Sequence, residues 1–305
     1  MLPNIKVVGV GGSGANTVSR IVKSGIDGIE LIAINTDVQA LHFCRAPKKI
    51  LIGKHTTKGL GAGMNVEVGK AAAEESRQEI TDALRGADMV FITCGLGGGT
   101  GSSAGPIIAE ISKGLGILTV AVVTMPFSFE GVQRKKIADT AVENLSSKVD
   151  SLLIIANDNL LKMVDEKTTV SNAFEMCDDI LRQAVRGITD LILTPGIINI
   201  DFASMVSILK DSGRALFGTG KAIGEQRAVQ AAKRAVGSPL LDFSINGAKG
   251  ILFNVAGNDI TLNEVKEAST IIAGHADPRA KILFGAVKDT TLKRGEIKVT
   301  VIATR

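Results

Sequence analysis

The sequence predicts an α/β protein in which a parallel-sheet domain is joined by a long central helix to a smaller α+β domain. The expected boundaries are residues 1–169, 170–194 and 195–305. Short apolar runs alternate with helical patterns in the first part of the chain, and a long amphipathic pattern follows. After Pro195 the order of expected strands and helices changes. Strands that alternate with helices indicate a parallel sheet with right-handed crossovers.

The expected strands of the first domain are near-continuous apolar runs, which is typical of a sheet covered on both faces. They are Ile5–Val10, Glu30–Asn35, Lys49–Ile52, Met89–Cys94, Leu118–Thr124 and Ser151–Ala156. The helical segments between them are Ala15–Ser24, Val66–Leu84, Gly105–Lys113 and Gly131–Ser147. Ligands of such sheets bind beyond the carboxyl ends of the strands.

The long amphipathic pattern lies between about Val170 and Leu193 and predicts a helix of about 22 residues, or roughly 33 Å at a rise of 1.5 Å per residue. So long an apolar stripe predicts a helix packed between two domains. Gly187 inside this helix is expected to cost about 1 kcal/mol relative to alanine. Pro195 and Gly196 are expected to end it.

The remainder of the chain predicts a smaller α+β domain. Its expected strands are Arg214–Gly218, Gly250–Ala256, Lys281–Val287 and Ile297–Ala303. Its expected helices are Ala203–Lys210, Glu225–Val236 and Leu262–Ala273.

The composition argues against nucleic acid as a partner. The 305 residues include no Trp, no Tyr and only 10 Phe, whereas platforms for single-stranded nucleic acid need aromatic side chains. The net charge of +4 is dispersed, and the runs Lys48–Lys49 and Arg134–Lys136 are short enough to be solvated surface.

The cysteine pattern and the hydropathy favour a cytoplasmic protein that does not insert into a membrane. Cys44, Cys94 and Cys177 are far apart and odd in number, so neither a zinc site nor a disulfide framework is expected. The N-terminus leads straight into a strand without a basic leader, and no apolar run reaches the length of a membrane span.

Two glycine-rich stretches follow expected strands. In "VVGVGGSGAN", Gly9, Gly11 and Gly14 fit the dinucleotide fingerprint G-x-G-x-x-G, and Asp37 stands near the position of a ribose-binding acid. Taken alone, this stretch favours a nicotinamide or flavin enzyme. The alternative is a tight strand–helix turn without a ligand.

The second stretch, "CGLGGGTGSSAGP", changes this interpretation. Glycines let successive N–H groups converge on an anion, and the hydroxyls of Thr100, Ser102 and Ser103 add donors. A helix expected to begin near Ser103–Gly105 adds its positive end. The stretch is not a Walker A motif, because no Gly-Lys-Ser/Thr follows. Two phosphate-facing loops at neighbouring strand ends predict a nucleoside di- or triphosphate.

The second glycine stretch and several other stretches resemble a known family. "GLGGGTGSSAGP" is similar to the tubulin signature of the FtsZ/tubulin superfamily. "GVGGSGANTV", "AINTDVQAL", "GLGAGMNVEVGKAAAEES", "GILTVAVVTMPFSFEG", "NDNLL", "GIINIDFA" and "SPLL" look like FtsZ sequences and occur in the same order. The resemblance covers essentially the whole chain. It implies the tubulin/FtsZ fold and a GTP-dependent polymerising GTPase of the cell-division ring.

The resemblance implies the nucleotide-binding residues position by position. The first three loops are implied to be Gly11, Gly12, Ser13 and Asn16, then Asn35, Thr36 and Asp37, then Gly61, Ala62 and Gly63. The phosphate loop is implied to be Gly97, Gly98, Gly99, Thr100 and Gly101, and the ribose contacts Glu130 and Arg134. The guanine contacts are implied to be Asn157, Phe174 and Asp179. A carboxylate can accept hydrogen bonds from the N1–H and N2–H groups of guanine. Alternatively, Phe174 is core and Asp179 an exposed helical acid.

The resemblance also implies a catalytic loop, "GIINIDFAS", that enters the nucleotide pocket of the next subunit. The family pattern is N-x-D-F-A-D. Asn199 and Asp201 fit this pattern, but Ser204 replaces its last acid. Because serine is a poor base and loss of a general base typically costs about 10²–10⁴-fold, we expect slow hydrolysis. The alternatives are that Asp211 substitutes or that Ser204 suffices. Smaller departures are Ser102 and Ser103 in the phosphate loop and Asp178, where Asn is common.

The implied ligands are GTP and GDP, with Mg²⁺ held between phosphates and water. No protein metal site is expected, since His42, His55 and His275 lack ligand spacing. The implied partner is the protein itself in a head-to-tail homopolymer at the mid-cell division site of the cytoplasm. Division-machinery adaptors are expected to bind through a C-terminal tail absent from these 305 residues.

Three other functions remain open at this stage. A nicotinamide-dependent oxidoreductase would explain Gly9, Gly11, Gly14 and Asp37, but not the second glycine stretch. A structural polymer of the same fold with little hydrolysis would explain Ser204. A different prokaryotic tubulin relative, used for cell shape or plasmid movement, would share the fold, although "PFSFEG" and "NIDFA" favour FtsZ.

Overall fold

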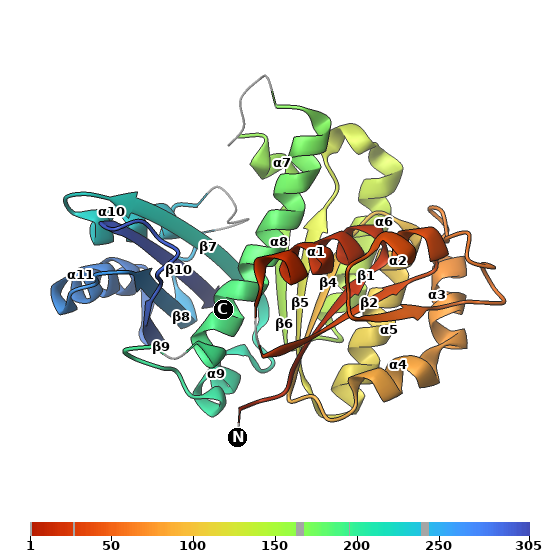
Figure 1. Ribbon diagram of the computed structural model, residues 1–305, viewed down its shortest axis with the longest axis horizontal. Coiled ribbons are helices and arrows are strands. Elements are labelled where there is room, and N and C mark those ends of the chain that lie inside the picture. Colours follow the sequence, from red (N-terminus) through yellow and green to blue (C-terminus); the bar gives the residue numbers. More distant parts are fainter. Residues whose placement is uncertain (1, 27, 163–167, 195, 239–243) are drawn as a thin grey trace. The chain divides into compact units, whose positions relative to one another are not determined.

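The computed structural model describes residues 2–26, 28–162, 168–194, 196–238 and 244–305 (Figure 1). The chain divides into two compact units, Met1–Val185 and Arg186–Arg305. The boundary falls inside the long helix α8 (Val170–Leu193). Pro195, the expected helix stop, lies outside the described residues, as does most of the "SPLL" motif.

The sheet of the first unit confirms the predicted parallel arrangement. Its strands are β1 (Ile5–Val10), β2 (Ile29–Asn35), β3 (Lys48–Leu51), β4 (Met89–Gly95), β5 (Leu118–Met125) and β6 (Ser151–Ala156). They lie in the order β3-β2-β1-β4-β5-β6, and neighbouring strands are parallel. Every residue of β1 and almost every residue of β4 and β5 is buried, as expected when helices cover both faces.

Two helices of the first unit, α1 and α5, begin closer to the preceding strand than predicted. The helices of this unit are α1 (Gly11–Ser24), α2 (Val38–Phe43), α3 (Val66–Glu75), α4 (Arg77–Leu84), α5 (Gly99–Gly114), α6 (Val132–Ser146) and α7 (Asn157–Leu160), with a 3₁₀ turn, η1 (Ser128–Glu130). The expected helix starts at Ala15 and Gly105 were therefore too late, because glycines that disfavour helix in isolation are held in the first turns by tertiary contacts. Ser76 interrupts the expected helix over 66–84.

One large apolar core lies under the strands of this unit. Side chains of α3, α4, α5 and α6 pack there against alternate strand residues such as Val8, Val10 and Ile92. Helix α1 packs against β1, β2 and β4, and Figure 1 shows it crossing in front of the sheet. The helices therefore fix the loops at the carboxyl ends of the strands.

The long helix α8 has 24 residues, close to the length of about 22 expected from its apolar pattern. Most of the apolar stripe is buried, whereas Phe174 is exposed and Ile192 is half-buried. The buried members are Ala173, Cys177, Ile180, Leu181, Ala184, Val185, Ile188 and Leu191. Gly187 also has a packing explanation. A Cβ atom there would lie 2.9 Å from the Thr300 side chain and 3.1 Å from the Phe217 ring. The glycine permits a close approach that alanine would obstruct.

The second unit is a four-stranded mixed sheet with helices. Its strands are β7 (Gly213–Ile223), β8 (Ala248–Gly257), β9 (Ala276–Lys288) and β10 (Glu296–Thr304), in the order β7-β10-β8-β9. Strand β10 is antiparallel to β7 and β8, and β8 is parallel to β9. The helices are α9 (Phe202–Leu209), α10 (Arg227–Val236) and α11 (Leu262–Ala273). Within the described residues, no helix combines the length and apolarity needed to cross a membrane.

Candidate nucleotide-binding site

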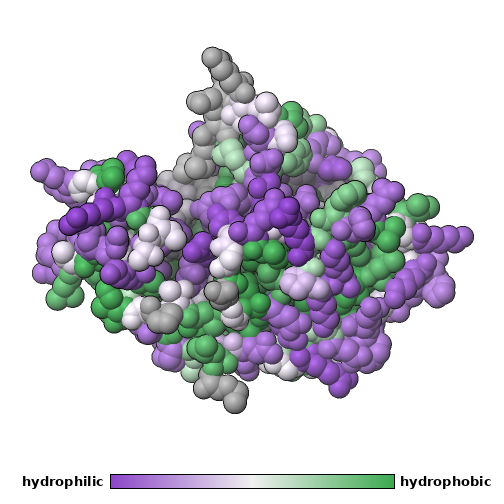
Figure 2. Space-filling view, in the orientation of Figure 1, coloured by the Kyte–Doolittle hydropathy of each residue, from purple (hydrophilic) through white to green (hydrophobic). Residues whose placement is uncertain are grey.

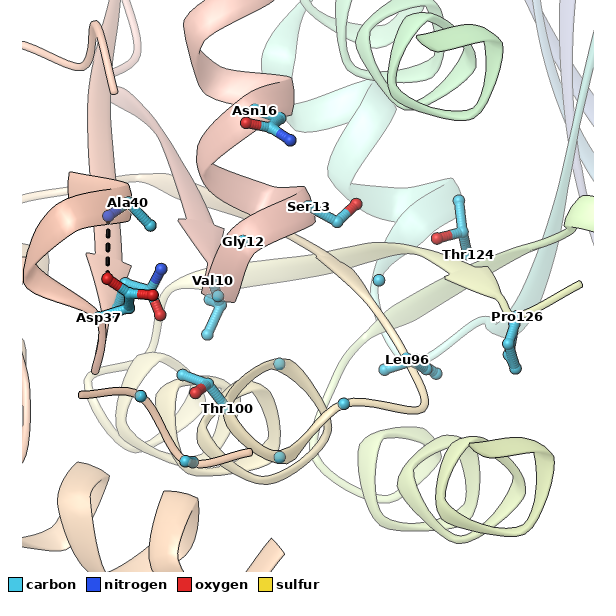
Figure 3. A pocket seen from close by; sticks show the side chains of 18 of the residues that line it. Val10, Gly12, Ser13, Asn16, Asp37, Ala40, Leu96, Thr100, Thr124 and Pro126 are labelled. Carbon is cyan, nitrogen blue, oxygen red and sulfur yellow. Dashed lines mark hydrogen bonds between the residues drawn. The ribbon is translucent and has the colours of Figure 1, made fainter. Parts of the chain in front are cut away.

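A cavity of about 490 Å³ lies at the carboxyl ends of the parallel strands of the first unit (Figure 3). The segments that follow all six strands line it, together with one face of the first half of α8. All the residues predicted to bind nucleotide line this cavity except Gly97 and Asp179. It also includes residues that were not predicted to bind nucleotide: Val10, Ala40, Gly95, Leu96, Thr124, Pro126, Cys177 and Asp178.

Helices α1 and α5 begin at this cavity without a side-chain cap. Helix α1 follows Val10 directly and α5 follows Gly98, and neither preceding residue offers a side-chain acceptor to the first turn. Helices α2 and α3, in contrast, are capped by the side chains of Asp37 and Asn65. The N–H groups and positive ends of α1 and α5 are thus oriented for an anionic ligand.

Glycines bring three loops together around this end of the cavity. Gly11 has φ +71°, and a Cβ atom there would lie 3.2 Å from the Gly101 nitrogen. Gly99 donates its N–H to the Gly63 carbonyl at 2.9 Å, and a Cβ atom on Gly99 would approach that oxygen to 2.5 Å. Larger residues would push the loops apart, so the glycines set the width of the cavity.

Hydroxyl groups hold these loops in register. The Thr36 and Thr100 hydroxyl oxygens are 2.7 Å apart, which links the end of β2 to the first turn of α5. The Gly97 N–H donates to the Ser102 hydroxyl at 2.9 Å, so Gly97 supports the loop from behind instead of lining the cavity. Asp37 Oδ1 accepts the N–H groups of Gln39 and Ala40, so this carboxylate first caps α2 (Figure 3).

The cavity lining also includes an aromatic ring and a buried acceptor. The Phe174 side chain, 39% exposed, packs edge-to-face on Phe127 with ring centroids 5.3 Å apart. Asn157 is buried, and its Oδ1 atom has no hydrogen-bond partner among the described residues. A buried acceptor of this kind fits a ligand that brings an N–H donor.

Asp178 occupies the position in this cavity that we expected for Asp179. Asp179 does not line the cavity, and its two carboxylate oxygens accept from Arg182 Nε at 2.8 Å and Gln183 Nε2 at 2.6 Å. Residues three and four apart share a helix face, so Cys177 and Asp178 follow Phe174 into the cavity while Asp179 is rotated away. This helical spacing was the available sequence signal for Asp178.

Neighbouring groups compensate only part of the cost of burying the charged Asp178 carboxylate. Burial raises its pKa to about 6, while Arg20, whose Nε lies 3.6 Å away, and the Ser13 hydroxyl, which donates at 3.3 Å, oppose this rise. The nearby Glu175 carboxylate adds to it. Asp178 therefore changes charge near neutral pH.

The two residues predicted at the ribose are bound to each other. Arg134 Nη1 donates to Glu130 Oε2 at 2.5 Å, and Glu130 Oε1 accepts the Phe127 N–H at 2.8 Å. The carboxylate is largely buried and the guanidinium is partly exposed. Within the described residues, no group of three His, Cys, Asp or Glu side chains could hold a metal ion.

The predicted catalytic residues lie in the second unit, whereas the described cavity-lining residues all belong to the first. Asn199 and Asp201 are exposed. The Asn199 side chain accepts the Gly196 N–H at 2.7 Å, and Asp201 caps α9 by accepting the Ser204 N–H at 2.8 Å. The Ser204 hydroxyl also donates to Asp201 and lowers the pKa of that carboxyl.

Comparisons with known proteins cover both units. Residues 4–165 match the model of the Tubulin/FtsZ family, GTPase domain, and residues 213–305 match that of the FtsZ family, C-terminal domain. An FtsZ dimer from M. jannaschii, described as empty, is 45% identical, with 100% of this chain and 89% of that chain covered and a TM-score of 0.96.

Two further structures are similar. A point mutant of M. jannaschii FtsZ is 44% identical, with 100% of this chain and 91% of that chain covered and a TM-score of 0.96. CetZ2 from Haloferax volcanii, described as a GTPγS-bound protofilament, is 20% identical, with 99% of this chain and 93% of that chain covered and a TM-score of 0.83. The likeness to CetZ2 concerns the fold alone.

Proposed function

The chain belongs to the Tubulin/FtsZ family and carries its GTPase domain, and from this premise we propose that it forms head-to-tail filaments in which GTP is hydrolysed between neighbouring copies. The observation that carries the proposal is the separation of the two sets of residues between the units. Asp37, Glu130 and Asp178 are the acids among the described cavity-lining residues, and each is engaged by protein groups. An exposed acid, Asp201, stands in the second unit.

We propose one orientation for GTP in the cavity of the first unit. Its phosphates meet the first turns of α1 and α5, whose N–H groups favour an anion. Its base meets Phe174, Asn157 and Asp178. Guanine presents N1–H and N2–H donors to a carboxylate, and adenine does not, so Asp178 selects the base. Glu130 and Arg134 are proposed to face the ribose.

The described residues offer no cluster that could hold a cation alone, so Mg²⁺ is proposed to bind through the phosphates and water. When bound, it neutralises phosphate charge. This chain contributes the N–H groups and the Thr100 hydroxyl that position the phosphates. The neighbouring copy contributes Asn199 and Asp201, which orient and polarise the attacking water.

A head-to-tail contact places different surfaces of two copies against each other, so it propagates into a filament unless the rotation closes it. Exposed apolar side chains are available in both units. Phe43 and Leu60 in the first unit are 81% and 85% exposed, and Leu262 in the second is 82% exposed. Figure 2 shows apolar residues reaching the visible surface among hydrophilic ones. By family membership, we place the filament in the cytoplasmic division ring at mid-cell, where adaptors attach it.

Ser204 supports a filament in which GTP hydrolysis is slow. With one carboxylate in place of two in the catalytic loop, we propose that hydrolysis lags behind assembly. The contrasting outcomes are that Asp211 supplies the second acid or that Ser204 suffices. A polymer with very little hydrolysis is the second candidate function, and it rests on the same residue. Family membership leaves no support for the nicotinamide alternative.

The test is simultaneous measurement of phosphate release and light scattering after GTP and Mg²⁺ are added to one sample. We expect scattering that persists while phosphate appears slowly, and no scattering with ATP. Brisk release with transient scattering would show an ordinary dynamic filament and contradict the role given to Ser204. Neither scattering nor release with GTP would contradict the polymerising function.

A further inference from the structure

A second cavity, of about 370 Å³, lies in the first unit between α3, α5 and α6. Helix α5 packs against both of the other helices (Figure 1). Apolar groups form part of its lining, including Pro106 and Ile107 of α5 and Ile137 and Ala141 of α6. The volume is at the lower end of the range of about 300–1,000 Å³ typical of small-molecule sites, so it suits one or two rings.

The polar part of this cavity is predominantly basic. Lys70, Lys136 and Lys148 line it, and Glu67 is the one acid among its described lining residues. Lys148 is paired with Glu110 at 2.7 Å. No described carboxylate forms an ion pair with Lys70 or Lys136, although Glu74 attracts Lys70 at longer range. The cavity therefore offers two lysines to an anionic group beside an apolar surface.

The two serines in the lining each hydrogen-bond to the loop that precedes α5 or to its first residue. The Ser102 hydroxyl accepts the Gly97 N–H, and the Ser103 hydroxyl donates to the Gly99 carbonyl at 2.6 Å. Both bonds run to the loop that lines the nucleotide cavity. The first turns of α5 thus separate the two cavities.

We propose that this second cavity binds a small organic anion, a molecule of one or two apolar rings that carries a single carboxylate, sulfonate or phosphate group. The rings lie against Pro106, Ile107 and Ile137, and the anionic group lies at Lys70 and Lys136. None of these residues has a part in the GTPase function proposed above. The two cavities share no described lining residue, so the site is separate from the nucleotide cavity.

The probe for this site is 8-anilinonaphthalene-1-sulfonate, which has an apolar ring system and one sulfonate. Its fluorescence is titrated with the full chain saturated with GDP, so that the nucleotide cavity is filled. Lys136→Glu is compared with Lys135→Glu, because Lys135 is the adjacent exposed residue of α6 and does not line the cavity. Both variants change the net charge equally, and GDP binding checks that both are folded.

We expect saturable binding to the unmodified chain, a loss of about tenfold or more in affinity for Lys136→Glu, and less than twofold for Lys135→Glu. The neutral analogue 1-anilinonaphthalene is expected to bind at least tenfold more weakly than the sulfonate. Absence of saturable binding, equal losses in the two variants, or equal binding of the neutral analogue would each overturn the proposal.

Discussion

The hydroxyl group of Ser204 donates to Oδ2 of Asp201 across 2.6 Å, while Oδ1 of the same carboxylate accepts the Ser204 N–H at 2.8 Å. Both oxygens of the one acid in the catalytic loop are thus bound by a single residue. These hydrogen bonds favour the ionised form and lower the pKa of Asp201. A carboxylate with a lower pKa is a weaker base, so Ser204 reduces the basicity of the loop as well as its charge.

Replacing Ser204 by an acid is therefore expected to accelerate hydrolysis. Ser204→Asp removes the hydroxyl that donates to Asp201 and adds a second carboxylate. We expect the hydrolysis rate at saturating GTP to rise by about 10–100-fold. Phosphate release per filament subunit is the measurement. Ser207→Asp, an exposed position on the same helix, is the control for added charge. Equal rates for the unmodified chain and Ser204→Asp would mean that Ser204 suffices.

Asp201→Asn is expected to abolish most of the hydrolysis without affecting nucleotide binding. The amide cannot take up a proton, so turnover falls by about 10²–10⁴-fold. GDP affinity stays within about twofold, because the described cavity-lining residues belong to the other unit. Single-turnover phosphate release and titration with a fluorescent GDP analogue measure the two quantities. A matching loss of GDP affinity would contradict this assignment.

Mixing experiments test whether the two copies share one site. Gly99→Ala copies keep Asp201 but are expected to bind nucleotide poorly, whereas Asp201→Asn copies bind it and lack the base. A mixture places the pocket of one variant against the loop of the other in some joints. We expect its phosphate release to exceed the sum of the separate rates. A rate equal to that sum would place pocket and base in the same copy.

GDP affinity is expected to depend on pH through Asp178. Burial raises its pKa to about 6, against the opposing charge of Arg20. Below that pH the protonated carboxyl loses an acceptor for guanine, so affinity falls as pH decreases, by up to about tenfold per pH unit. Titrations between pH 5 and 8 on the unmodified chain and Asp178→Asn measure this component. It should disappear in Asp178→Asn and persist in Asp179→Asn, which changes the neighbouring acid outside the cavity.

Gly99→Ala tests the close approach of two loops. The new Cβ atom would lie 2.5 Å from the Gly63 carbonyl oxygen, so the loops must separate, and we expect at least a tenfold loss of GDP affinity. Gly114→Ala is the matched control at the other end of α5, where a Cβ atom meets nothing within 4 Å. The control is expected to bind GDP normally and to be up to about 1 kcal/mol more stable in denaturant unfolding.

The sequence predicted the strands well and the starts of the two phosphate-facing helices poorly. Apolar runs as long as Ile5–Val10 are nearly unambiguous in a sheet covered on both faces. Glycine has a low helix propensity, so the pattern placed α1 and α5 at Ala15 and Gly105. Their actual starts at Gly11 and Gly99 depend on contacts between loops that are distant in sequence.

The candidate site was predictable where residues are contiguous and less so where helical geometry decides. The loops around Gly11, Thr36 and Thr100 line the cavity as the resemblance implied. On α8, one position along the helix rotates a side chain by about 100°, which exchanged Asp179 for Asp178. The hydrogen bonds of Asp37 to α2 and of Ser204 to Asp201 follow from backbone geometry that residue types alone do not determine.

The missing side-chain caps of α1 and α5 have a consequence for the stability of the protein itself. The N-termini of α1 and α5 lack the side-chain acceptor that α2 and α3 possess, so a bound phosphate group supplies what the polypeptide does not. A nucleotide present at a hundred times its dissociation constant adds about 2.7 kcal/mol to the free energy of unfolding. We therefore expect guanine nucleotide to stabilise the folded chain, so that removal of GTP and GDP lowers its resistance to unfolding as well as its assembly.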